Sequence, residues 1–154
     1  MSKLSYDDEA KLLSRAIDLA IESVKKLPPK GFDDNHINHF VSTYLDYKNK
    51  VLNPEPKYKN SKSLAYIENA ILTYFQEGTG DAVHFFWKTV NDQNLGFKRK
   101  NKLDKILKRQ KIKNQIEYDF VIDVLIPYQQ EGLLSEADAQ KLNQMIARFE
   151  KTSV

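Results

Sequence analysis

Residues 10–24 of the chain read AKLLSRAIDLAIESV. The apolar side chains in this stretch recur at intervals of three and four residues, which is the spacing of one face of an α-helix. The stretch therefore predicts an amphipathic helix that buries this face against other helices. Ser5 is a suitable capping residue before the helix, and the pair Pro28-Pro29 stops it.

The same spacing recurs through the rest of the sequence. We expect further helices over 33–52, 63–77, 81–94, 98–113 and 114–131, and a last one that starts at Ser135. Pro127 is expected to end or kink the sixth helix, because proline lacks the amide donor and clashes with the preceding turn. No pair of segments shows a convincing strand pattern. The sequence thus predicts an all-α fold, a compact bundle of about six to seven helices with mixed packing angles.

Length and composition limit the class of protein. The chain has 154 residues, 41% of them hydrophobic and 29% charged, which favours a single globular domain over 1–154. The absence of cysteine excludes a disulfide scaffold, a thiolate zinc site and a cysteine nucleophile. No apolar stretch approaches the roughly 20 residues of a membrane-spanning helix. The first residues are acidic and polar, unlike a secretory signal. We therefore expect a cytoplasmic protein with no membrane partner.

Positive charge is concentrated in one segment. Residues 98–113 contain nine lysine and arginine residues against a single aspartate, although the net charge of the chain is only +3. The remainder must then be net negative, which indicates a polarised surface. If the segment is one helix, its ridge is Lys98, Lys102, Lys105 and Arg109, widened by Lys100, Lys108 and Lys111. We predict that this ridge is a binding surface for a nucleic-acid backbone or for an acidic protein.

A second basic patch lies between 48 and 62. It consists of Lys48, Lys50, Lys57, Lys59 and Lys62, with Tyr47 and Tyr58 as candidate stacking faces. Lysine dominates both basic segments, whereas base reading and bidentate phosphate contacts favour arginine. The excess of lysine over arginine therefore argues against nucleic acid as the first choice of ligand.

Residues that could carry chemistry are few. The metal-like set consists of His36, His39, His84 and Asp81, with Asp33, but both aspartates fall where helix capping explains them. The sequence Gly78-Thr79-Gly80 lacks the third glycine and the preceding strand of a dinucleotide-binding turn. No nucleophile elbow is present. We expect neither an enzyme, nor a metal site, nor a cofactor.

Two functions remain as expectations. The first is a non-enzymatic protein-binding module that acts through its polarised charged surface, with the general profile of an immunity protein that neutralises a bacterial toxin. In that case the acidic groups Asp7–Glu9 and Glu117, Asp119 and Asp123, or the basic ridge, match a partner of opposite charge. The alternative is a nucleic-acid-associated accessory protein that uses the basic helix 98–113. The sequence does not predict the oligomeric state.

Overall fold

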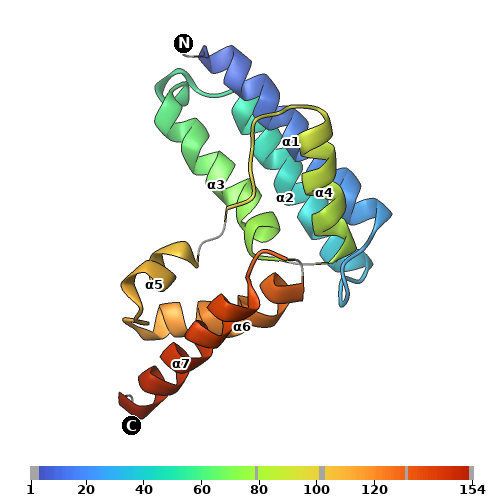
Figure 1. Cartoon of the computed structure of the whole chain (residues 1–154). Helices are drawn as coiled ribbons and strands as arrows, with labels where there is room; N and C mark the ends of the chain where they lie inside the picture. Colours follow the sequence, from blue (N-terminus) through green and yellow to red (C-terminus); the bar gives the residue numbers. More distant parts are fainter. Residues whose placement is uncertain (1–3, 79, 101–102, 131, 153–154) are drawn as a thin grey trace. The chain divides into compact units, whose positions relative to one another are not determined.

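The computed structural model describes residues 4–78, 80–100, 103–130 and 132–152. Its described residues form helices joined by loops and turns and contain no strand, which confirms the predicted all-α class (Figure 1). The elements are α1 (Tyr6–Lys26), α2 (Asp34–Leu52), a short 3-10 helix η1 (Pro56–Tyr58), α3 (Ser61–Glu77), α4 (Asp81–Asp92), α5 (Asp104–Arg109), α6 (Gln115–Gln130) and α7 (Glu136–Thr152).

The chain divides into two compact units. Unit 1 comprises residues 1–76 and 80–99, and unit 2 comprises residues 77–79 and 100–154. Buried apolar side chains form two separate clusters, one within each unit. The organisation of 1–154 as a single domain, which the sequence favours, therefore stays a prediction.

Unit 1 is held together by helix packing and by aromatic rings. Helix α1 packs on α2 and α4 with a face that includes Ile17 and Val24, both fully buried. The rings of Phe75 on α3 and Phe86 on α4 stack with their centroids 4.0 Å apart. Tyr44 of α2 donates its hydroxyl proton to the carbonyl of Ile71 on α3 over 2.7 Å. Burial raises the pKa of this phenol, so it remains a donor.

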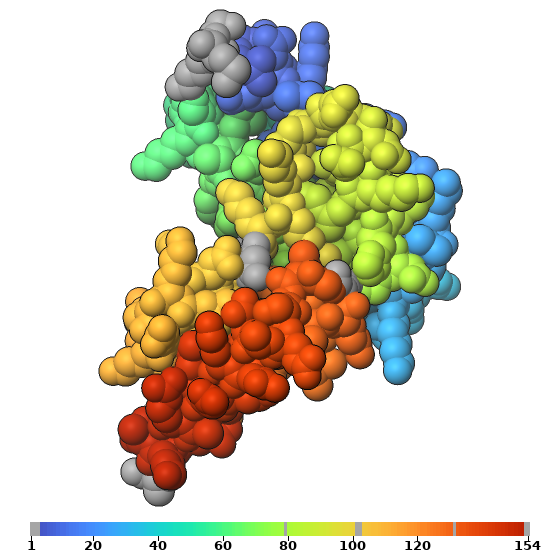
Figure 2. Space-filling model, viewed as in Figure 1, coloured from blue at the N-terminus to red at the C-terminus, as the bar shows by residue number. Residues whose placement is uncertain are grey.

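Unit 2 is built from the three C-terminal helices. Helix α7 packs on α6 and α5, and its side chain Leu142 is fully buried in the second apolar cluster. Figure 2 shows the surface of these helices on one face, coloured from orange to red. Helix α6 continues three residues beyond Pro127 to Gln130. Of the two expectations for Pro127, that it ends the helix is therefore excluded, because a proline in the last turn interrupts only one hydrogen bond there, and the kink stays a prediction.

Local signals set most helix starts. Ser5, Asp33 and Ser135 each accept a hydrogen bond from the backbone amide three residues later, as capping predicts. Helix α3 differs, since Asn60 rather than Ser63 is the acceptor there, with its side-chain oxygen 2.9 Å from the Ser63 amide. This fixes the chain that leads from η1 into α3.

Candidate functional site

The basic segment 98–113 is not one helix. Lys98 and Lys100 lie in irregular chain before α5, and Lys102 lies outside the described residues. Among the residues of this segment that the structure describes, only 104–109 are helical. Moreover, Lys98 belongs to unit 1 and Lys105 to unit 2. The prediction of a single helical ridge was therefore wrong. Lys105 and Lys108 remain exposed on α5, and their role in binding stays a prediction.

Two features end α5 early. Gln110 adopts a left-handed backbone conformation with φ 61°, which stops the helix after six residues. Ile112 then turns inward and is only 3% exposed. The free energy gained by burying this one side chain is larger than the helix propensity of the surrounding lysines. Asn114 starts the next helix, because its side-chain oxygen accepts from the Glu117 amide over 2.9 Å.

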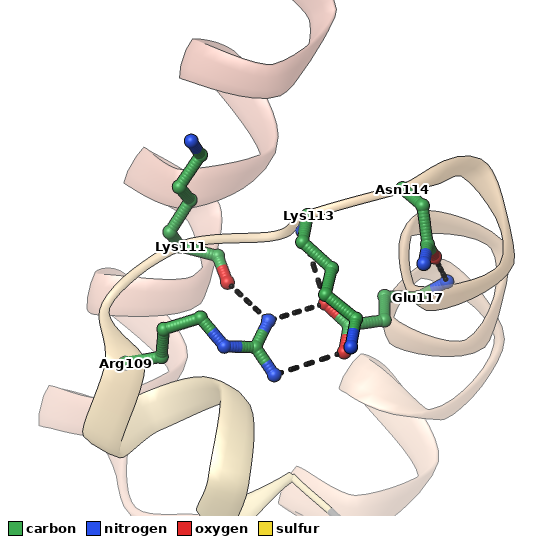
Figure 3. Close-up of polar contacts among 5 residues, drawn as sticks. All are labelled: Arg109, Lys111, Lys113, Asn114 and Glu117. Carbon is green, nitrogen blue, oxygen red and sulfur yellow. Dashed lines mark hydrogen bonds and ion pairs between the residues drawn. The ribbon is translucent and has the colours of Figure 1, made fainter.

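Arg109 is engaged within the molecule rather than presented to a ligand (Figure 3). Its Nη1 and Nη2 donate to the two carboxylate oxygens of Glu117 over 2.6 and 3.1 Å, and Nη1 also reaches the carbonyl of Lys111. The Lys113 amide donates to the same carboxylate over 3.0 Å. This arrangement closes the loop between α5 and α6. Glu117 was expected on an acidic binding surface, but its carboxylate, 17% exposed, serves this loop.

The Arg109–Glu117 pair predicts a pH dependence of stability. The hydrogen bond from Arg109 lowers the pKa of Glu117 below its ordinary value of 4.5. The stabilisation is therefore full above 4.5 and is lost as the pH falls through the lowered value. We expect wild type to be more stable than Glu117→Gln at neutral pH, and the difference to shrink as the pH falls below 4.5. Denaturant midpoints from far-UV circular dichroism at each pH measure this.

The matched control for that series is Glu136→Gln, because Glu136 is an exposed glutamate in the first turn of α7. It should follow the wild-type pH profile. A gap between wild type and Glu117→Gln that stays constant down to low pH would contradict the assignment.

The histidines do not assemble a metal centre in the described part of the chain, where no three histidine, aspartate or glutamate side chains are close enough to hold an ion. His36, His39, His84 and Asp81 are all exposed. Asp33 caps α2 through the His36 amide, and its carboxylate also lies 2.8 Å from Nδ1 of the His36 ring. These hydrogen bonds, the backbone one first, lower the pKa of Asp33. Capping thus accounts for the spacing of Asp33 and His36.

The second basic patch, by contrast, forms a defined surface. The start of α1, the end of α2, η1 and the start of α3 gather at one end of unit 1 (Figure 1). Between them lies a groove of about 890 Å³, within the usual range of ligand sites. We call it the tyrosine groove. Its aromatic and basic lining consists of Tyr6, Tyr47, Tyr58, Tyr66, Lys50, Lys57 and Lys62.

One wall of the tyrosine groove is a fixed loop between α2 and α3. Pro54 and Pro56 restrict its backbone, and η1 forms a turn within it. Asn60 links η1 to α3, because its amide nitrogen donates to the carbonyl of Lys57 while its oxygen accepts from the Ser63 amide. On the opposite wall the Tyr6 hydroxyl donates to the carbonyl of Val51 over 2.9 Å. The groove is therefore already shaped without a ligand.

Lysine and tyrosine side chains are paired around the groove. The ammonium groups of Lys50, Lys57 and Lys59 lie 5.9, 4.9 and 5.8 Å from the ring centres of Tyr47, Tyr58 and Tyr6, respectively. Each lysine also has a carboxylate within 3.2 to 3.7 Å, from Asp46, Glu55 and Asp7. These ion pairs are exposed, so each contributes little and can be exchanged for a ligand.

The most exposed rings are those of Tyr66 and Tyr58, at 73% and 53%. The sequence pointed to Tyr47, Tyr58 and the lysines, but it gave no sign of Tyr6 and Tyr66. These two are 60 residues apart, and only the tertiary packing of unit 1 brings them to one groove. Lys48, which was expected in this patch, pairs instead with Asp18 of α1 over 2.9 Å.

Comparisons with models of protein families, with curated proteins and with solved structures find no match to this chain. In the described residues, no helix is both long and apolar enough to cross a membrane.

Proposed function

We propose that the chain is a non-enzymatic protein-binding module whose partner docks in the tyrosine groove. The observation that carries this proposal is the exposure of Tyr58 and Tyr66 on a groove that is already shaped. Tyrosine is enriched where binding energy concentrates in protein interfaces, because it offers a large amphipathic surface with few rotatable bonds. A fixed wall also reduces the ordering cost of binding.

The charges around the groove favour a protein over a nucleic acid. Four lysines, Lys50, Lys57, Lys59 and Lys62, stand beside three carboxylates, so the surface carries both signs. A backbone of phosphates is held by an excess of positive charge. A mixed set of charged groups around aromatic anchors resembles the polar rim of a protein interface.

The alternative, a nucleic-acid-associated accessory protein that uses residues 98–113, has weaker support. Its ridge is not a single helix, and Arg109 is held by Glu117. A test should therefore leave Arg109 in place and change Lys105 and Lys108 to glutamate. If those changes abolish retention on a heparin column and the groove variants below leave it unchanged, the nucleic-acid alternative replaces our proposal.

The proposal predicts that Tyr58→Ala with Tyr66→Ala abolishes partner capture. Tagged wild type is incubated with lysate of its source cells after nuclease treatment, and a single protein should co-purify in a fixed ratio. Loss of two interface anchors costs about 2 kcal/mol or more, which is roughly 30-fold in affinity. Titration of the purified partner against wild type and the variant measures this change in affinity.

The matched control for the groove variant is Leu45→Ala with Leu52→Ala, because both side chains are about half exposed, at 49% and 45%, and neither lines the groove. It should capture the partner as wild type does. Equal capture by the groove variant, or capture that disappears after nuclease treatment, would overturn the proposal.

Two finer points belong to the same proposal. We propose that the module acts as a neutralising partner of the immunity type, which a toxin gene directly beside its own gene would support and the absence of a toxin among its captured partners would contradict. We also propose a cytoplasmic location, which suits a chain without cysteine.

A further inference from the structure

Helix α6 carries an apolar face that its own unit leaves uncovered. Ile116, Ile122 and Ile126 are exposed at 80%, 46% and 63%. Val121, Val124 and Tyr128, on the other side of the helix, are buried in unit 2. A helix that is apolar on both sides needs cover on both. Neighbouring isoleucines exposed in this way are typical of an interaction surface.

Two carboxylates lie on the same exposed face. Asp119 and Asp123 are four residues apart, so they form a row beside Ile122 and Ile126. Among the described residues, no lysine or arginine forms an ion pair with either carboxylate, and Asp119 accepts a hydrogen bond from Gln115. A ligand that complements this face would offer both apolar area and positive charge.

The tyrosine groove has this composition. Tyr58 and Tyr66 supply apolar ring area, and the lysines supply exposed ammonium groups whose present ion pairs are weak. We propose that the α6 face of one copy docks into the tyrosine groove of a second copy. This inference rests on the proposed use of the groove for protein binding, and it names an acidic amphipathic helix as the kind of element the groove accepts.

A symmetric contact between two α6 faces is disfavoured. An antiparallel pair centred near Val121 would bring Asp119 of one copy close to Asp123 of the other, and like charges at such distances repel. A contact between two different surfaces avoids this repulsion. It also leaves one groove and one α6 face free at the ends, so further copies can add.

Sedimentation velocity of the purified full-length chain tests the inference. We expect the mass to rise with protein concentration, and the rise to weaken at high salt because exposed charge pairs are screened. Two double variants, Ile122→Ser with Ile126→Ser and Tyr58→Ala with Tyr66→Ala, should each stay monomeric. All four side chains are exposed, so both variants should fold; far-UV circular dichroism checks this.

Mixing the two variants separates the possible contacts. The groove variant keeps an intact α6 face and the α6 variant keeps an intact groove, so an equal mixture should form a dimer of one each and nothing larger. A groove variant that still dimerises alone would show a symmetric α6 contact and overturn the inference. A wild type that is monomeric at every concentration would also overturn it. Neither result would decide whether the groove binds another protein, because the capture experiment with the groove variant tests that proposal on its own.

Discussion

Replacement of Phe86 by alanine should lower the free energy of unfolding by about 3–5 kcal/mol. Its ring is fully buried, stacks on Phe75 and meets Trp87 at 5.0 Å. The substitution removes apolar contacts and leaves a cavity that the surrounding helices fill only in part. Urea unfolding followed by the fluorescence of Trp87, the sole tryptophan of the chain, measures the loss within unit 1.

The control for Phe86→Ala is Tyr66→Ala in the same unit, because that ring is 73% exposed. Its effect should stay within about 0.5 kcal/mol. A loss below about 1 kcal/mol for Phe86→Ala would contradict the packing of α3 against α4, since a phenylalanine that is truly buried cannot be removed at so low a cost.

Replacement of Leu142 by alanine should destabilise unit 2 by about 2–5 kcal/mol. Leu142 is fully buried on the face of α7 that packs against α6. Far-UV circular dichroism during urea unfolding measures the effect. Ile116→Ala is the control, since that side chain is 80% exposed and its removal should change stability by no more than about 0.5 kcal/mol in dilute protein. Equal effects of the two changes would contradict the described core of unit 2.

The same measurements test the prediction of a single domain. Trp87 reports on unit 1 alone, whereas circular dichroism averages over all helices. A single cooperative domain requires the two transitions to coincide in wild type and in both core variants. Separate transitions would show that the two clusters unfold on their own.

The sequence predicted the long helices well because their apolar stripes and caps act locally. Ser5, Asp33 and Ser135 cap helices where the pattern placed them. The segment 98–113 was predicted badly because its lysines sit at helical spacing whether or not a helix forms. Its true limits depend on the burial of Ile112 and the left-handed turn at Gln110, and tertiary packing decides both.

The candidate site was predicted only in part for a similar reason. The local composition of 47–62 was enough to predict part of the site, because Tyr47, Tyr58 and the lysines between 50 and 62 lie close in sequence. Tyr6 and Tyr66 join them only through the packing of three helices. Arg109 was expected to face a ligand, and its partner Glu117 lies on the next helix, beyond the reach of any helical spacing rule.

The fixed wall of the tyrosine groove has a kinetic consequence. Because Pro54, Pro56 and Asn60 hold the loop in place beforehand, no slow rearrangement of this segment has to precede an encounter. Changes at Tyr58 or Tyr66 should then leave the association rate almost constant and shorten the lifetime of the complex. The time a partner stays bound, rather than the speed of its arrival, becomes the quantity that these two rings control.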